Sequence, residues 1–557
     1  MSNASQNGSA AILRVNDRLY SRFADSIQGN GRSRKPELLL RNISRAARFA
    51  ALFHSGRFAD GAIENPAFEI GASLNGVRGS YVHPMPERRR AGGRRVLHVV
   101  SEVGGVGGHT RMLHYWIQND RSSHHALAVA NQRGLPVPEW MAGAMKAAGQ
   151  GLYVLPEAAP VIEKARWLRE AARRTADLVI VHHYPWDVTP TVAFAHAGGP
   201  PVLVLNHADH SFWLGSSAAD GVIDLRSVAT RYTCTRRAVE RSVLLPVPLT
   251  DSFKGPSRAE ARRVLGIDDG QVALLSVARP EKFRPYGPYD FPGTMGKILE
   301  RHPQAHMYVV GESEEGIAPY LRQPLHPRLH FVGVQEDTSL YRAAADLYLE
   351  TFPFGTQTGL LEAALAGVAV VPAYAPLFPL LVANDDALCS LIPNPESEQE
   401  HMERANALIQ DAARRREEGA ALRSALLRGN VGEAWMGRLE AVYRAAEGLE
   451  HRPAPIPVSQ CRPTADDINL SLWHAMADGR RFAANLDGST EGAQLRHAAG
   501  ASKYVGCYGA ARRYALAALV SEPKQKASWS LAATVMAGAA GPLIHRVLRR
   551  FRDKRAR

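Results

Sequence analysis

Residues 96–111 read VLHVVSEVGGVGGHTR, in which an apolar run is followed by a glycine-rich turn and then by a helical pattern. Residues 347–362 read LYLETFPFGTQTGLLE and repeat this arrangement in the second half of the chain. Such a turn leaves backbone N–H groups at a helix start, where they can bind phosphate. One turn of this kind is weak evidence for a fold, but two of them predict two Rossmann-like domains with phosphate chemistry between them.

The rest of the chain supports a division into two α/β domains. Its 557 residues exceed what a single core usually holds, so we expect two main domains plus extensions. Short apolar runs alternate with helical stretches, which is typical of parallel sheets. The expected strands are Val96–Val100, Ala126–Ala130, Leu152–Leu155, Leu178–Val181 and Val202–Leu205, then Val272–Val277, His306–Val310, Leu329–Val332, Leu347–Leu349 and Val368–Val371.

The expected boundaries follow from this pattern. A basic N-terminal extension covers 1–94, and the two Rossmann-like domains cover 95–252 and 253–449. A C-terminal extension covers 450–557, and we expect the helix of Trp435–Ala446 to cross back to the first domain.

Cysteine usage indicates a reducing compartment. The four cysteines are scattered without CxxC spacing, which argues against a disulfide framework or a structural zinc site. The polar N-terminus has no apolar stretch long enough for a signal peptide, so we expect a cytoplasmic protein.

The net charge of +13 is concentrated at the two ends of the chain. Residues 1–95 hold 16 Lys/Arg and 7 Asp/Glu, a net +9, and residues 541–557 hold 7 basic and 1 acidic side chain, a net +6. The intervening residues are therefore near neutral, at −2. This distribution argues against nucleic acid as a partner of the core and favours tethering to an anionic surface.

The C-terminal tail is the expected tether. Ala527–Ile544 lacks formal charge but is interrupted by Gly541-Pro542, which makes it borderline as a membrane span. Beyond it, apolar and basic residues fall on different faces of a helix, which could lie at the inner face of a membrane. A solvated or disordered tail is the alternative.

Several cofactor motifs are absent. The first turn has Thr110 where a dinucleotide fingerprint needs its third glycine, and it lacks a suitable acidic residue downstream, so NAD is disfavoured. The sequence contains neither an Asp-x-Asp pair, which would hold a divalent ion on a diphosphate, nor a Walker motif.

Charged and polar residues follow the second set of strands. Arg279 and Lys282 come just after an apolar strand, where two cations could neutralise a diphosphate leaving group. The hydroxyls and amides of 355–359 suit a phosphate at a helix start. Glu362 could accept hydrogen bonds from ribose hydroxyls, or could simply interact with the helix dipole.

Taken in order, these features resemble the GT-B glycosyltransferases over about residues 95–448. The segment Thr351–Glu362 is the most distinctive, and it is similar to the donor loop of O-GlcNAc transferase-like enzymes and, more loosely, of family-4 transferases. Family-4 enzymes carry a Glu-x7-Glu pair, whereas this chain has Phe354 at the first position. A family-4 retaining mechanism therefore cannot be assumed.

The resemblance implies a donor site in 253–449 and an acceptor site in 95–252. It implies that Arg279, Lys282 and the loop of 355–359 hold the diphosphate. It further implies that Glu362 holds the ribose and that the Gly333-Val334 backbone holds the base. The implied donor-binding residues are Gly107, Gly108, Arg279, Lys282, Gly311, Gly333, Val334, Gly355, Thr356, Gln357, Thr358, Gly359 and Glu362.

The first domain offers histidines at strand ends as catalytic candidates. His207 is the first choice, with Asp209 and His210 as neighbours that could tune it, and His109 on the glycine-rich turn is the second. Lone histidines are often structural, and His207, Asp209 and His210 could also ligate a metal, although no third segment supplies a ligand.

The expected function is metal-independent transfer of a sugar from a UDP- or GDP-linked donor to an acceptor hydroxyl, without a further cofactor. The acceptor would be a glycan, a lipid-linked molecule or a protein. Two alternatives stay open at this stage: a catalytically inactive GT-B-like binding or assembly partner, and a basic protein whose ends bind a membrane surface or nucleic acid.

Overall fold

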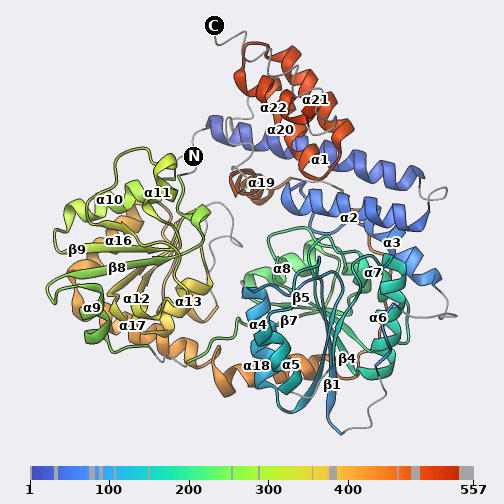
Figure 1. The fold of residues 1–557 in the computed structure, drawn as a ribbon, viewed down its shortest axis with the longest axis horizontal. Helices are drawn as coiled ribbons and strands as arrows, with labels where there is room; N and C mark the ends of the chain where they lie inside the picture. Colours follow the sequence, from blue (N-terminus) through green and yellow to red (C-terminus); the bar gives the residue numbers. More distant parts are fainter. Residues whose placement is uncertain are drawn as a thin grey trace.

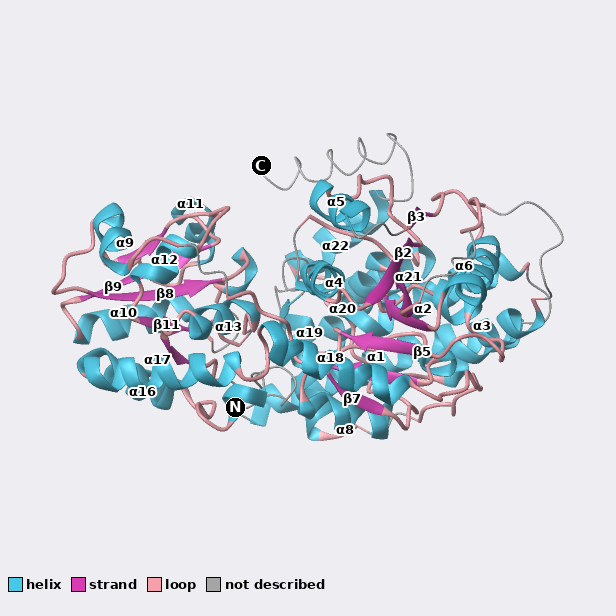
Figure 2. Cartoon of the chain, turned by 90° about the horizontal axis from the view of Figure 1, so that it is seen from below, coloured by secondary structure: helices cyan, strands magenta, loops and turns pink. Residues whose placement is uncertain are grey.

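The computed structural model describes residues 3–30, 35–74, 82–86, 92–105, 108–147, 151–251, 255–285, 289–353, 355–374, 386–460, 463–477 and 490–537. Two α/β lobes, each built on a parallel sheet, stand side by side (Figure 1). Helices lie on both sides of the strands in each lobe (Figure 2). This is the GT-B architecture that the sequence predicts.

The first sheet has the strand order β3-β2-β1-β4-β5-β6-β7, and its neighbouring strands are all parallel. The chain order reverses between β1 and β4, and ligands of open α/β sheets bind beyond the carboxyl ends of the strands at such a point. The strands are β1 Arg94–Val100, β2 Ser123–Val129, β3 Leu152–Val154, β4 Leu178–His182, β5 Val202–Asn206, β6 Gly221–Asp224 and β7 Ser242–Leu244.

Two groups of helices cover this sheet. Apolar residues of α4, α5 and α18 pack on one face, and those of α6 and α7 pack on the other. These helices and α8 are α4 Gly108–Asn119, α5 Glu139–Ala147, α6 Val161–Thr175, α7 Thr189–Ala193, α8 Ser227–Arg236 and α18 Gly432–Ala446.

Helix α18 joins the two lobes, because it follows the second lobe in sequence but packs on the first. Trp435 is fully buried, and its indole N–H donates to the carbonyl oxygen of Pro246 at 2.8 Å. The Tyr443 hydroxyl accepts a hydrogen bond from the Trp116 indole at 2.8 Å. The predicted return of this helix to the first domain is therefore found in the structure.

The second sheet has the order β10-β9-β8-β11-β12, again fully parallel, and its chain order reverses between β8 and β11. Helices α10 and α16 pack on one face, and α9, α12, α13 and α17 pack on the other. The elements are β8 Val272–Val277, β9 Ala305–Val310, β10 Leu329–Phe331, β11 Leu347–Leu349, β12 Ala369–Val371, α9 Arg258–Leu265, α10 Phe291–Arg301, α11 Glu314–Ile317, α12 Ser339–Ala344, α13 Thr358–Leu365, α15 Asp386–Cys389, α16 Glu398–Gln410 and α17 Ala412–Leu427. Short 3-10 helices lie at Ser216–Ala218, Pro280–Lys282 and Ala318–Tyr320.

Helices from both chain ends form a joint layer above the first lobe (Figure 1). Apolar residues of the N-terminal helices share one core with the first sheet and with α20, so residue 94 does not mark the edge of a core. His54 bonds to Asp467, and His497 bonds to Asn16, which ties the two ends together. The helices are α1 Asn3–Asn30, α2 Pro36–Leu52, α3 Gly61–Ser73, α19 Ala465–Ala477, α20 Glu491–Tyr504, α21 Tyr508–Ser521 and α22 Lys526–Ala537.

All ten predicted strands are confirmed, with ends shifted by a few residues at most. Strands β6 and β7 were not predicted, because each is short. Within the described residues, no helix is both long enough and apolar enough to span a membrane. The basic tail of 541–557 lies outside the described residues.

Candidate functional site

The two glycine-rich turns face each other between the lobes. Gly108 begins α4 at the carboxyl end of β1, and Thr358 begins α13 beyond the carboxyl end of β11. A Cβ atom added to Gly108 would lie 3.6 Å from the Thr358 hydroxyl oxygen. A cavity of about 280 Å³ lies beside this approach and is lined by α4, by α13 and by the connection between the lobes. Gly107, also predicted to bind the donor, lies outside the described residues.

The loop before α13 is strained. Gln357 has φ 54° and ψ −68°, and the Thr358 N–H donates to the Thr356 carbonyl oxygen at 2.7 Å, which makes a tight γ-turn. A residue other than glycine rarely adopts this backbone conformation, and such strain is concentrated at ligand sites. The next N–H groups, at the first turn of α13, have no intrahelical acceptor. The loop therefore presents a ready anion-binding surface.

Lys282 reaches this loop from the end of β8. Its ammonium group donates to the carbonyl oxygen of Gly355 at 2.6 Å. Burial lowers the pKa of Lys282 to about 8, although the charge of Glu350 opposes that shift. Arg279 is on the same connection but its side chain is 75% exposed, and it lies 3.8 Å from Glu281. Of the two predicted cations, only Lys282 is held against the loop, and Arg279 is free to approach a ligand.

Glu350 is a site residue that the sequence reasoning missed. Its buried carboxylate accepts hydrogen bonds from the Thr351 N–H at 3.0 Å and from the Thr356 N–H at 2.9 Å. The Thr356 hydroxyl donates to the same carboxylate at 3.1 Å. Burial raises the pKa of Glu350, whereas these bonds and the charge of Lys282 oppose the shift. An acidic residue directly after a buried strand was the signal that could have identified it.

Glu362 stands at the boundary between the lobes. Arg342 of α12 donates to one carboxylate oxygen at 2.7 Å, and Arg111 of α4 lies 3.9 Å from the other. The Glu362 side chain is still 31% exposed, so a ligand can reach it. Sequence reasoning missed Arg342, which carries no local signal because its partner lies in a different helix.

The predicted base-binding residues lie at the carboxyl ends of β9 and β10. The Gly311 N–H donates to the Gly333 carbonyl oxygen at 2.8 Å, which joins the two strand ends. Gly311 has φ 116°, and a Cβ atom there would lie 1.8 Å from the carbonyl oxygen of Ala278, so only glycine fits. Val334 is 79% exposed, and its apolar side chain is available to a flat ring.

The structure brings His109 and His207 together. Their ring centroids are 4.2 Å apart and their planes are inclined by 30°. Burial lowers the pKa of His109 to about 3, and the neighbouring His182 and His183 lower it further. Burial lowers the pKa of His207 well below its usual value, and His109 and His183 add to that shift. Both imidazoles are therefore neutral near pH 7, and a neutral imidazole can accept a proton.

A row of buried histidines leads away from this pair. His98 bonds to His125 on one side and to His182 on the other, each at 3.0 Å. Asp120 lies 3.3 Å from His125 Nε2, and its pKa is held low by the hydrogen bonds it accepts, despite its burial. If Asp120 accepts from His125 Nε2, each following ring must donate through Nε2 and accept through Nδ1. His182 then ends the row with a buried Nδ1 that has no partner among the described atoms.

Asp209 and His210 are placed differently from His207. The Asp209 carboxylate forms a buried ion pair with Arg226, and its backbone carbonyl accepts from Arg237 at 2.8 Å. His210 Nδ1 lies 3.3 Å from the Asp209 carboxylate. Arg226 is the first charged group that lowers the pKa of Asp209 against its burial. Asp209 thus anchors the loop, and its charge only weakly raises the pKa of His207. Within the described residues, no group of three or more His, Cys, Asp or Glu side chains is arranged to hold a metal ion.

No family model and no curated protein matches the sequence. Solved structures of similar shape include HepE from Anabaena in complex with UDP and glucose, which is 16% identical, with 64% of this chain and 99% of that chain covered and a TM-score of 0.46. An O-GlcNAc transferase variant from Thermobaculum terrenum is 18% identical, with coverages of 77% and 84% and a TM-score of 0.45. WaaG, a glycosyltransferase involved in lipopolysaccharide biosynthesis, is 16% identical, with coverages of 64% and 100% and a TM-score of 0.43. These values are too low to assign a function, and the fold is defined by the strand order of the chain itself.

Proposed function

We propose that the protein transfers a sugar from a nucleotide-sugar donor to an acceptor hydroxyl. The observation that carries this proposal is the meeting of the two glycine-rich turns, with Gly108 against Thr358 and with Lys282 held on the donor loop. A diphosphate placed there meets a fixed cation and the first amides of α13. The donor is proposed to be UDP- or GDP-linked.

The chemistry divides between the two lobes. The bond between the sugar carbon and the diphosphate oxygen breaks, and the charge that develops on the diphosphate is stabilised by Lys282, by Arg279 and by the α13 amides. The acceptor oxygen forms the new bond to the sugar carbon, and its proton passes to the neutral imidazole of His207. Closure of the lobes would exclude water and limit hydrolysis of the donor.

The nucleoside has separate contacts in this proposal. Glu362 accepts from the ribose hydroxyls, and the base lies against the Gly333-Val334 backbone. Fixed positive groups replace a divalent ion at the diphosphate, so we expect transfer to continue in the presence of EDTA. The acceptor is proposed to be a glycan, a lipid-linked molecule or a protein.

Nucleotide binding and turnover test this function separately. We expect one of UDP, GDP, ADP, TDP and CMP to raise the melting temperature, because a ligand that binds the native state stabilises it. The matching nucleotide sugars are then assayed for transfer and for hydrolysis. Lys282→Ala and Glu362→Ala should abolish transfer while circular dichroism stays native. Arg414→Ala, at an exposed position of α17, should leave transfer unchanged. Unchanged turnover in either cleft variant would refute the assignment.

We also propose that the protein works at the inner face of a membrane, through the basic tail of 541–557. Each basic residue near an anionic surface contributes about 1 kcal/mol. Deletion of the tail should abolish salt-sensitive binding to vesicles containing phosphatidylserine, without loss of nucleotide binding. Equal vesicle binding by the full-length and truncated proteins would exclude this role for the tail.

A further inference from the structure

A second cavity lies outside the cleft. Its volume is about 530 Å³, which is within the range of small-molecule sites. It is lined by residues 255–257, which follow the connection between the lobes, and by the starts of α9 and α17. Asp346 and Val368, which also line it, precede β11 and β12, so the cavity is at the amino-end edge of the second sheet. The donor loop is at the opposite edge.

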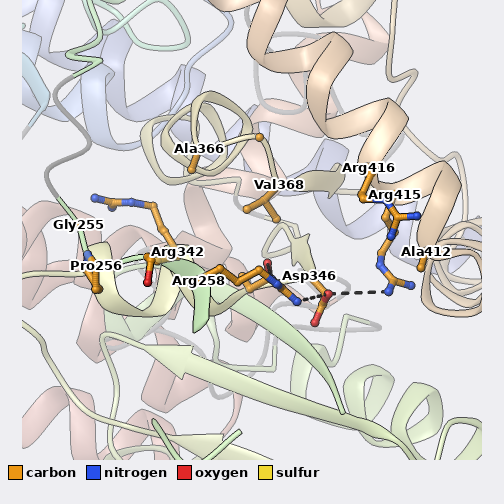
Figure 3. Close-up of a pocket in the computed structure, with 14 residues that line it drawn as sticks. Gly255, Pro256, Arg258, Arg342, Asp346, Ala366, Val368, Ala412, Arg415 and Arg416 are labelled. Atoms are coloured by element: carbon orange, nitrogen blue, oxygen red, sulfur yellow. Dashed lines mark hydrogen bonds and ion pairs between the residues drawn. The ribbon is translucent and has the colours of Figure 1, made fainter. Parts of the chain in front are cut away.

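Positive charge dominates the lining of this cavity. Four arginines and one carboxylate contribute to it: Arg258, Arg342, Arg415, Arg416 and Asp346. Figure 3 shows Arg258 and Arg415 directed at Asp346, with nitrogen-to-oxygen distances of 2.7 Å and 3.8 Å. A third guanidinium, that of Arg262, lies 3.1 Å from the same aspartate. Arg342 is paired with Glu362. The Asp346 carboxylate alone cannot neutralise the remaining guanidinium groups, so the cavity keeps a net positive charge.

Two further observations favour an anionic ligand. Arg416 is on the exposed surface of α17 and lines the cavity beside Arg415 (Figure 3). The first residues of α9 and α17, Arg258 and Ala412, also line it, so both helix dipoles present their positive ends. Guanidinium groups bind phosphate oxygens through paired N–H donors.

We propose that this cavity binds a phosphate-bearing small molecule at a site distinct from the donor cleft. The cavity is large enough for more than a free phosphate ion, and Arg416 supplies a cation that is accessible from solvent. Arg342 lines this cavity and the cleft alike, and its guanidinium donates to Glu362. A ligand here would therefore lie close to the connection between the lobes and to the donor-binding carboxylate.

Calorimetric titration of the full-length protein with pyrophosphate tests the proposal. The Lys282→Ala background removes the cleft as a competing diphosphate site, and we expect one class of binding site to remain in it. Adding Arg416→Gln should weaken that binding at least fivefold. The control is Arg414→Gln, which removes the same charge from the same helix but does not line the cavity.

The outcomes separate this site from the proposed function. Retained UDP binding in Arg416→Gln, together with at least fivefold weaker pyrophosphate binding in the double variant than in Lys282→Ala, supports the second site. Absence of pyrophosphate binding to Lys282→Ala protein overturns it, as does equal weakening by Arg414→Gln, which would indicate general charge attraction. Native circular dichroism and melting temperature in each variant establish that the comparison is made between folded proteins.

Discussion

Lys282 Nζ donates to the Gly355 carbonyl oxygen at 2.6 Å, so the cation of the β8 end is fixed on the loop that precedes α13. The cost of this position is desolvation, which lowers the pKa of Lys282 from 10.5 to about 8. Since the unfolded chain binds the proton more tightly, this group destabilises the fold below about pH 8, and its penalty disappears as the pH rises toward 10.5. An anionic donor at the loop offsets that penalty, because it favours the charged lysine.

The first prediction concerns the pH dependence of the reaction. The value of kcat/KM should fall about tenfold per pH unit above about pH 8, because the free enzyme then loses the ammonium. In Lys282→Arg the falling limb should disappear, since arginine stays charged, although the rate should be lower because its planar head does not match the ammonium position. A wild-type profile that stays flat to pH 9.5 would show that this cation is not required.

The second prediction concerns Glu362. In Glu362→Gln the side chain keeps its size but loses its charge, and hydrogen bonds to a charged group contribute about 1.5–3 kcal/mol. We therefore expect the Kd of the nucleoside diphosphate to rise at least tenfold in calorimetry. Glu417→Gln, at an exposed position of α17, is the matched control and should leave the Kd unchanged. Equal affinity in wild type and Glu362→Gln would exclude a ribose contact.

The third prediction tests the backbone of the loop that precedes α13, which we propose binds the donor. A Cβ atom on Gly359 would lie 2.8 Å from the Tyr348 hydroxyl and 2.9 Å from the carbonyl oxygen of Val277. Because the latter is a backbone atom of β8, Gly359→Ala should displace α13, with a loss of stability of about 1–3 kcal/mol. Nucleotide binding should weaken more than tenfold. Gly429→Ala, where no heavy atom lies within 4 Å of the added Cβ, should bind nucleotide normally.

Local patterns were enough to predict most of the fold but only part of the site. The apolar runs of Val96–Val100 and Val272–Val277 identify central strands because each is a continuous buried segment. Gly221–Asp224 and Ser242–Leu244 could not be identified, because each is too short to show a pattern of its own and is defined by its pairing with neighbouring strands. Strand order is likewise a property of the packed sheet.

The same limit explains which site residues were found. Glycines and threonines in 355–359 form a local motif, so the sequence identifies them. The contact between Arg342 and Glu362 depends on how α12 packs beside α13, which the sequence does not show. The row of His98, His125 and His182 lies on three separate strands, and it becomes visible only when those strands are placed side by side.

The fourth prediction concerns this histidine row. Burial lowers the pKa of His98 and of His182, so the native state holds both rings neutral while the unfolded chain gains protons below about pH 6.5. Above that pH neither ring affects the free energy of unfolding through protonation. Below it, that free energy falls by up to about 1.4 kcal/mol per pH unit for each ring. Urea unfolding at pH 7.5, 6.5 and 5.5 should show this decline.

His98→Leu tests two contributions of the histidine row to stability: its hydrogen bonds and its proton uptake on unfolding. It leaves nitrogens of His125 and His182 buried without a partner, so the free energy of unfolding at pH 7.5 should fall by about 2–5 kcal/mol. The decline between pH 6.5 and 5.5 should become shallower, since one proton fewer is taken up on unfolding. A variant with wild-type stability, or with an unchanged pH dependence, would contradict the hydrogen-bonded row.

The fifth prediction tests the return of α18 to the first lobe. Trp435 is fully buried against Tyr115 and Trp116, and its indole N–H is bonded to the Pro246 carbonyl oxygen. Trp435→Ala should therefore destabilise the first lobe by about 3–5 kcal/mol, through the cavity it creates and the acceptor it leaves unpaired. Arg438→Ala, at an exposed position of the same helix, should change stability by less than about 0.5 kcal/mol. Because α18 also connects the lobes, Trp435→Ala should raise the KM for the donor. A variant that loses neither stability nor donor affinity would show that α18 does not need this contact to hold the cleft together.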